Sequence, residues 1–145
     1  MKTYERKVNY YETDQMGIVH HSNYIRYFEE ARVSFMEQAG YPYERLEQEE
    51  IMSPVLGINC KYMHPLRFGD TFRVEVRLVR MTKLKCSFSY EIFDAKTGEQ
   101  KAKGRSDHGF VDRNGRPVIL PKSKPEFYEV FGRELEPEEQ EESDE

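Results

Sequence analysis

The sequence predicts an α+β fold in which one long helix crosses one face of a curved antiparallel sheet. Three observations predict this fold. A single long helical pattern occurs early in the chain, and its mostly aromatic stripe needs a large apolar surface to pack against. One strand is expected before this helix and four after it, and three of these four alternate apolar and polar residues. Short turns join the four strands, which favours antiparallel neighbours.

The predicted central helix spans residues 24–39. Read at a period of 3.6 residues, one side of it is apolar and the remaining positions are mostly charged. Ser22 or Asn23 is the expected N-cap, since either side chain can accept a hydrogen bond from the first turn. Gly40 and Pro42 end the helix. The apolar stripe consists of Tyr24, Phe28, Ala31, Phe35 and Ala39, with Ile25 and Met36 at its margins.

Two strands and two connections surround this helix in the first half of the chain. A first strand is expected at residues 3–11, and residues 43–50 form a short helical or irregular connection. A second strand spans residues 54–63 and alternates in a way that predicts one buried face. Residues 64–70 contain Pro and Gly and form a turn. The predicted buried face comprises Leu56, Ile58, Cys60 and Tyr62.

The second half of the chain contains the remaining strands. Two long alternating strands are expected at residues 72–78 and 84–92, and the turn between them lacks Gly and Pro, which leaves their register open. Residues 94–98 form a hairpin turn into a last strand over residues 100–112. A short helix is expected over residues 124–131.

The charge distribution divides the chain into one domain and a tail. Of the 27 acidic residues, eight lie between Glu134 and Glu145, where there is no basic residue, so the 22 basic residues face 19 acidic ones before Glu134. The body is therefore mildly basic. We expect one domain at residues 1–132, without internal repeats, and a disordered, solubilising acidic tail at residues 133–145.

Composition excludes several classes of protein. The 145 residues are 37% hydrophobic, with 10 Tyr, 9 Phe and no Trp, which is typical of a globular domain with a real core. The N-terminus lacks the apolar run of a signal peptide, and no segment has the length of a membrane span. Cys60 and Cys86 stand alone, which favours a reducing cytoplasm. No metal site is predicted, because adjacent histidines without clustered carboxylates or cysteines make a poor ligand set.

Residues 11–24 contain most of the groups that acyl-transfer chemistry needs. A carboxylate, Asp14, a glycine, Gly17, and two histidines, His20 and His21, directly precede the helix. Thioester hydrolysis requires stabilisation of an oxyanion and either a base that activates water or a nucleophile. Free backbone N–H groups at a helix N-terminus suit the oxyanion. From its position alone, however, Asp14 fits a turn or capping residue better than a catalytic one, because many loop aspartates have that role.

These residues also carry a resemblance to a known family. The run YYETDQMGIVHHSNYIRYFEEAR, the turn HPLRFGD and the late VDRNGRPVILP resemble the hotdog-fold acyl-CoA thioesterases, in the 4-hydroxybenzoyl-CoA thioesterase and YbgC-like branch. The resemblance covers the chain to about Phe131. It implies that the helix is wrapped by a five-stranded antiparallel sheet, that the protein is a homodimer or homotetramer, and that the active sites lie between subunits. The pattern is matched by Asp14, Gly17, Ile18, Val19, His21 and Tyr24.

The resemblance implies roles for individual residues. Asp14 is expected to be the general base or nucleophile and His21 a second catalytic residue, and the His21 backbone N–H is the likeliest oxyanion donor by the family pattern. Glu29 and Tyr62 are weaker candidates for substrate binding, as are the cations near the coenzyme A phosphates, because spacing specifies none of them. The expected oxyanion and pocket residues are Gly17, Val19, His20, Ser22 and Tyr24, and the cation candidates are Arg80, Lys83, Lys85, Arg105, Arg113 and Lys122.

The predicted function is hydrolysis of an acyl-CoA to a free acid and coenzyme A. No cofactor is expected, because coenzyme A is part of the substrate, and neither nucleic acid nor a membrane is an expected partner. Two alternatives stay open: a hotdog acyl-CoA dehydratase or hydratase, and a non-catalytic acyl-CoA-binding protein. The sequence leaves the acyl group undefined. His108 is interpreted as a core or interface histidine, since no partner motif accompanies it.

Overall fold

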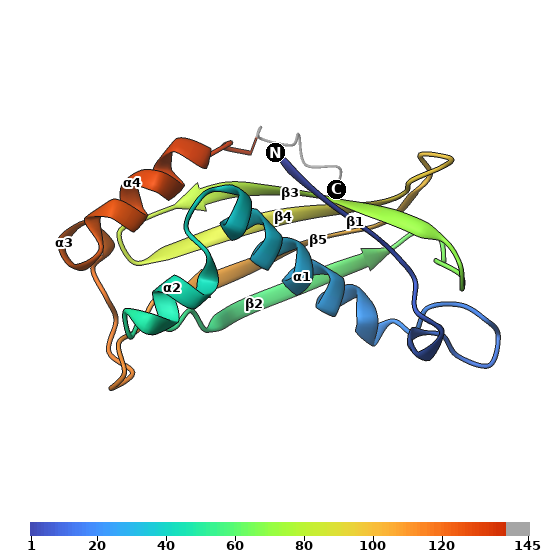
Figure 1. Cartoon of the computed structure of the whole chain (residues 1–145), viewed down its shortest axis with the longest axis horizontal. Helices are drawn as coiled ribbons and strands as arrows, with labels where there is room; N and C mark the ends of the chain where they lie inside the picture. The colour runs from blue at the N-terminus through green and yellow to red at the C-terminus, as the bar shows by residue number, and fades with distance from the viewer. Residues whose placement is uncertain (139–145) are drawn as a thin grey trace, which may run out of the picture.

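The computed structural model describes residues 1–138, which form one sheet, one long helix and several short ones (Figure 1). The strands are β1 (Lys2–Lys7), β2 (Val55–Tyr62), β3 (Thr71–Met81), β4 (Lys85–Asp94) and β5 (Gln100–Gly109). The helices are α1 (Ser22–Gln38), α2 (Tyr43–Gln48), α3 (Leu120–Ser123) and α4 (Pro125–Glu134), and a 3-10 turn, η1, spans Tyr10–Glu12.

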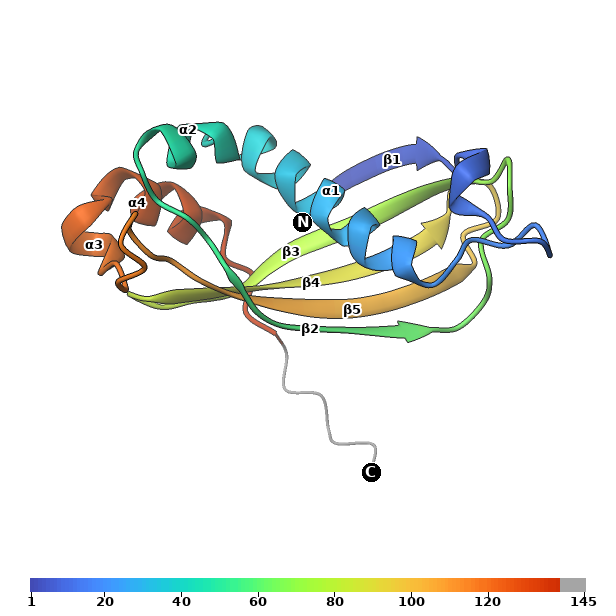
Figure 2. The ribbon, with the colours of Figure 1, turned by 90° about the horizontal axis from the view of Figure 1, so that it is seen from below.

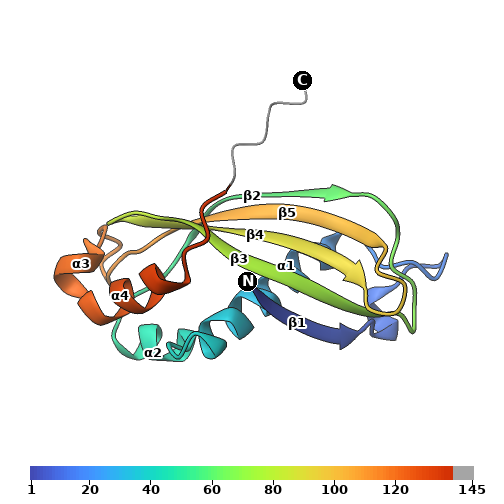
Figure 3. The same ribbon diagram turned by 90° about the horizontal axis from the view of Figure 1, so that it is seen from above.

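The five strands pair antiparallel in the order β1-β3-β4-β5-β2, and α1 lies across one face of the sheet (Figures 2 and 3). The predicted α+β architecture is therefore confirmed. One expectation about its topology is wrong: β2 and β3 are joined by a short loop but are not neighbours. Two strands, β5 and β4, lie between them, so the loop crosses the end of the sheet and does not form a hairpin.

Helix α1 differs in detail from its prediction. It begins at Ser22, and its N-cap position is His21, whose side chain makes no capping hydrogen bond, so neither Ser22 nor Asn23 is the N-cap. The stripe is rotated slightly: Tyr27 is fully buried, whereas Ile25 is 39% exposed. Its C-terminus follows the prediction, because Gly40 adopts a φ of 88° and lets the amide of Tyr41 bond the carbonyl of Met36.

Helix α1 packs tightly against the sheet at Gly104 of β5. A Cβ at this position would lie 2.3 Å from the Asn59 carbonyl oxygen and 2.6 Å from a ring carbon of Phe28. Phe28 instead lies flat against Tyr90 of β4, with ring centroids 4.4 Å apart. The missing side chain thus lets an aromatic ring of α1 rest directly on the sheet.

Strand β2 contradicts the prediction of a buried apolar face. It is an edge strand, and Leu56, Ile58 and Tyr62 are 55%, 37% and 48% exposed, with Cys60 half-buried. Within residues 1–138, α1 covers only part of this strand: the ring of Tyr62 lies 5.1 Å from that of Tyr24, but Leu56 and Ile58 stay exposed. The other edge strand, β1, is rich in charged residues, which is a common protection against edge pairing.

The C-terminal part of the described chain packs against the far end of β3. Helix α4 buries Phe127 and Phe131 and continues to Glu134, and Leu135 then forms a bridge with Leu78. The predicted boundary at residue 132 is therefore too early, because packed structure extends past it. The rest of the predicted tail, residues 139–145, lies outside the described residues. Within residues 1–138, no helix is long and apolar enough to span a membrane.

Candidate active site

The loop before α1 is closed by its own backbone hydrogen bonds. The amide of Asp14 donates to the carbonyl of Ile18 at 2.9 Å, and the amide of Gly17 donates to the carbonyl of Asp14 at 3.0 Å. Thr13 and Val19 form a bridge just outside this pair. Gly17 adopts a φ of 75°, a conformation that favours glycine, so this residue permits the tight turn.

A buried carboxylate anchors this loop, and sequence reasoning missed it. Glu12 is 4% exposed, and Arg6 donates two hydrogen bonds to its two oxygens, one of them at 2.9 Å from Nη1 to Oε1. The amide of Asn9 donates to the same carboxylate at 2.7 Å. Burial acts to raise the pKa of Glu12, but the hydrogen bonds from Arg6 and Asn9 outweigh it and hold the pKa below its ordinary value.

The main chain of Glu12 then ties the loop to the head of α1. Its carbonyl oxygen accepts from the amide of His20 at 2.8 Å and from Nδ2 of the buried Asn23 at 2.9 Å. The side chain of Asn23 thus links the first turn of α1 to the preceding loop and does not cap the helix. The only sequence signal for this pair was the presence of a glutamate and an asparagine beside the Asp14 loop, and neither residue type is specific enough to reveal it.

The side chain of Asp14 is half-buried and performs one local function. Its Oδ1 accepts from the amide of Met16 at 2.8 Å, which is the turn role that a loop aspartate often has. Its Oδ2 has no hydrogen-bond partner within residues 1–138. One oxygen therefore orients the carboxylate, and the other is available to a reacting group.

Of the backbone N–H groups of His20, His21 and Ser22 at the head of α1, one has no partner among the described residues. The amide of His20 is used by Glu12, and the amide of Ser22 donates to Nδ1 of His20 at 3.2 Å. The amide of His21 has no partner in the described part of the chain. This N–H belongs to the same closed loop as Asp14, at the positive end of a 17-residue helix.

The neighbouring candidates surround this amide in different ways. The rings of His20 and His21 are exposed and lie 4.2 Å apart, and Nδ1 of His20 is 2.8 Å from the Ser22 hydroxyl. Tyr62 donates from its hydroxyl to the carbonyl of His21 at 3.3 Å. Tyr24 is buried, and its hydroxyl accepts from the amide of Leu66 at 3.1 Å, so it supports the adjacent turn and does not face the site. Val19 is likewise buried and bonds the same turn through its amide.

The cations expected to bind the coenzyme A phosphates do not lie near Asp14 of the same chain. Arg80, Lys83 and Lys85 are exposed around the β3–β4 turn, which contacts Leu120 at the end of the sheet opposite the Asp14 loop (Figure 1). A single chain therefore does not bring them together with Asp14. Within residues 1–138, no three histidine, cysteine or acidic side chains are arranged to hold a metal.

A cavity of about 250 Å³ lies between the C-terminal half of α1 and the sheet. Glu29 and Val55 are exposed at its margin, and Cys86 lies on its wall, where burial raises the pKa of the thiol to about 12. Arg32, the residue ten positions after Ser22, also lines it, so this part of α1 is about 15 Å from the helix head. Its apolar walls come from Met36, Leu46, Phe88, Phe110, Phe127 and Phe131.

A long helix packed on a five-stranded antiparallel sheet, with an oriented carboxylate and a free amide at the helix head, defines a hotdog-fold protein of the thioesterase class. The chain belongs to the Thioesterase-like superfamily, whose family model matches residues 8–135. The family expected from the sequence motif is thereby confirmed.

Individual relatives are similar over most of their length. The chain is 41% identical to a putative esterase of Aquifex aeolicus over 119 residues, which cover 82% of this chain and 91% of the relative. It is 34% identical to the putative acyl-CoA thioesterase YneP of Bacillus subtilis over 128 residues, covering 88% and 92%. The structure of the DHNA-CoA thioesterase from Staphylococcus aureus superposes with a TM-score of 0.86 at 28% identity, covering 90% of this chain and 88% of that one.

Proposed function

We propose that the protein hydrolyses acyl-CoA thioesters, with Asp14 as general base or nucleophile and the backbone N–H of His21 as an oxyanion donor. The observation that carries this proposal is the closed loop that holds both groups: a carboxylate oriented through one oxygen, with its other oxygen free, and a free amide at the helix head. The similarity to YneP, which is named as a putative acyl-CoA thioesterase, supports the substrate class.

The proposed chemistry follows from these two groups. Asp14 either removes a proton from a water molecule that attacks the thioester carbon or attacks that carbon itself to form an anhydride, which water then cleaves. In both routes negative charge develops on the former carbonyl oxygen, where the His21 N–H and the positive end of α1 stabilise it. The carbon–sulfur bond then breaks, and the coenzyme A thiolate takes up a proton.

A second copy of the chain completes the proposed site. The apolar, exposed β2 is the edge suited to pairing with another chain, whereas β1 is protected by charge. Within one copy the end of β2 touches the helix head through Tyr62, and the start of β2 lies at the cavity through Val55. A two-fold antiparallel pairing of β2 strands places the end of one beside the start of the other, so Asp14 of each copy faces the cavity of the other.

The test is an Asp14→Asn variant assayed for thiol release from a panel of aromatic and aliphatic acyl-CoAs. Asparagine keeps the oxygen that accepts from Met16 but cannot act as base or nucleophile, so we expect intact folding and a loss of at least about 100-fold in turnover. The matched control is Asp112→Asn, because Asp112 makes the same kind of turn contact, with the amide of Asn114, outside the proposed site. Turnover in Asp14→Asn equal to that of this control would contradict the assignment.

The same assay separates the two alternative functions. Absorbance changes on an enoyl-CoA without thiol release would indicate a hydratase, and tight acyl-CoA binding without turnover would indicate a binding protein. A His21→Ala variant keeps its backbone N–H, so we expect a smaller loss than for Asp14→Asn.

A further inference from the structure

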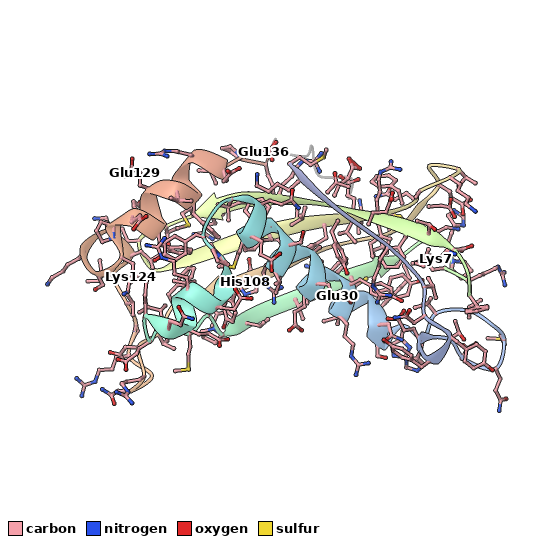
Figure 4. All side chains as sticks on the ribbon, in the orientation of Figure 1. Lys7, Glu30, His108, Lys124, Glu129 and Glu136 are labelled. Atoms are coloured by element: carbon pink, nitrogen blue, oxygen red, sulfur yellow. The ribbon has the colours of Figure 1, made fainter. Side chains whose placement is uncertain are left out.

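A series of hydrogen-bonded polar groups that the proposed chemistry does not use lies beside the cavity, and its two ends, Arg32 and His108, line the cavity wall. Arg32 donates from Nη1 to the hydroxyl of Tyr90 at 3.1 Å, and that hydroxyl lies 2.6 Å from the hydroxyl of Ser106. Ser106 in turn lies 2.6 Å from Nε2 of His108. Ser106 and His108 are 0% and 1% exposed, and His108 lies beneath the C-terminal half of α1 (Figure 4).

The donor-to-acceptor direction of these hydrogen bonds determines which ring nitrogen of His108 carries the proton. Arg32 can only donate, so the oxygen of Tyr90 accepts from it and its own O–H is free to donate to Ser106. Ser106 then donates to Nε2 of His108, which places the ring proton on Nδ1. The opposite direction would leave the hydroxyl hydrogen of Tyr90 without an acceptor among the described residues, a costly state for a buried group.

This assignment leaves one donor without a partner at the cavity. His108 lines the cavity, and its Nδ1 has no hydrogen-bond partner within residues 1–138. Burial lowers the pKa of His108 to about 4, so the ring is neutral near pH 7 and carries this single N–H. Among the described residues only the hydroxyl of Tyr27 is a fully enclosed side-chain polar atom without a partner, so Nδ1 of His108 is open to the cavity. A ligand in this mostly apolar cavity can supply the acceptor that Nδ1–H lacks.

We propose that this cavity is the acyl pocket and that Nδ1–H of His108 selects acyl groups that carry an oxygen acceptor. This inference rests on the proposed function. The volume of about 250 Å³ exceeds the roughly 150 Å³ of an apolar cavity that holds benzene, so it accommodates a small acyl group with one substituent. An acyl group without such an oxygen would enter the same space but leave the donor unpaired. His108 is therefore a specificity-determining residue, and Arg32, Tyr90 and Ser106 position its proton.

Two variants of His108 separate its two ring nitrogens. In His108→Gln the longer amide can take the place of Nε2 and keep the contact with Ser106, but no donor remains at the position of Nδ1. In His108→Asn the shorter amide can donate from the position of Nδ1, but it loses Ser106. The substrates are benzoyl-CoA with its hydroxy and methoxy derivatives, and a saturated acyl-CoA with the oxo-acyl-CoA of equal length.

We expect the wild type to prefer the oxygenated member of at least one pair in kcat/KM. His108→Gln should reduce that preference, measured as the ratio of the two kcat/KM values, about tenfold, the scale of one unpaired donor. His108→Asn should keep most of the preference. Equal preferences in wild type and His108→Gln would overturn the proposal, as would a loss in His108→Asn that matches the loss in His108→Gln.

A readout without turnover keeps this inference separate from the proposed function. The ¹⁵N spectrum of the chain, which has four histidines, should show His108 protonated at Nδ1 and unprotonated at Nε2 at neutral pH. Added hydroxybenzoate or methoxybenzoate should shift the Nδ1 proton more than benzoate does. A proton on Nε2, or equal shifts with all three acids, would overturn the inference even if Asp14 proves catalytic.

Discussion

At the scale of single residues, the candidate site depends on groups that hold the Asp14 loop in place. Asp14 is positioned because Glu12, beneath the loop, is held by Arg6 and Asn9 and because its carbonyl oxygen binds His20 and Asn23. Because the amide of His20 donates to Glu12, it is not available at the head of α1, whereas the amide of His21 stays free. Arg6 is shared between two carboxylates, since its Nε also donates to Oε1 of Glu30 in α1 at 2.7 Å.

We predict that Glu12→Gln lowers the free energy of unfolding by roughly 2 kcal/mol at neutral pH, because Arg6 loses one of its two carboxylate partners and keeps only Glu30. Turnover should fall as well, because the loop loses its anchor. Chemical denaturation followed by circular dichroism measures the change. The control is Glu5→Gln on the exposed side of β1, which should stay within about 0.5 kcal/mol of wild type.

The pH dependence of the same ion pair has a defined sign. The pKa of Glu12 is lower in the folded protein than in a free glutamate, where it is about 4.3. The ionised Glu12 side chain therefore makes its full contribution to the free energy of unfolding above about pH 4.3, and this contribution is lost as the pH falls through the folded pKa. The stability difference between wild type and Glu12→Gln should therefore shrink on acidification below about pH 4. A difference that stays constant down to pH 2 would contradict the assigned role of the ion pair.

At the scale of elements, the contact between α1 and β5 sets the depth at which the helix lies on the sheet. Gly104 leaves space for Phe28, and Phe28 stacks on Tyr90, which is also a member of the hydrogen-bonded chain to His108. The position of the helix over the cavity and the geometry of that chain are therefore coupled. A change at Gly104 should affect both.

We predict that Gly104→Ala destabilises the fold by about 2 kcal/mol or more, because the added methyl group would meet backbone of β2 and the ring of Phe28 well inside contact distance. Thermal and denaturant unfolding measure the effect. Gly132→Ala is the matched control: it lies in α4 with no atom within 4 Å of the added Cβ, so we expect it to be neutral or slightly stabilising. Equal stabilities of the two variants would contradict the close-packing argument.

At the scale of the whole molecule, the two halves of the proposed site are at different ends of one chain. The loop before α1 and the β3–β4 turn lie at opposite ends of the sheet (Figure 1). The cavity is lined by the C-terminal half of α1, away from Asp14. An exposed apolar edge strand runs between them. The proposed pairing of two β2 strands connects the halves across copies, and it predicts that activity belongs to the pair and not to a single chain.

We predict complementation between two inactive variants. Asp14→Asn removes the reacting carboxylate, and Met36→Trp fills the cavity, so each should be inactive as a pure protein. Co-expressed with different tags, they should recover about one quarter of wild-type activity, because half of randomly assorted dimers are mixed and each has one intact site of two. The absence of any recovery in isolated mixed dimers would place Asp14 and the cavity in the same copy and contradict the proposed assembly.

The sequence by itself determined the class of fold, the position of the long helix and the loop that carries Asp14, Gly17 and His21. These features depend on periodicity and on local conformational preference, which neighbouring residues set. It also marked β2 as rich in apolar residues. It did not indicate that these side chains stay exposed at an edge of the sheet, where we propose that a second chain packs on them.

Only the tertiary structure decided which groups meet. Glu12 and Asn23 lie 11 residues apart, and Arg32 and Tyr90 lie 58 apart, and nothing in local sequence marks either pair as partners. The strand order separates β2 from β3 despite their short loop, which in turn places His108 and the cavity beside the start of β2. Long-range contacts of this kind arise from how the sheet and helix pack as a whole, so the free amide of His21 and the unpaired donor of His108 became visible only in three dimensions.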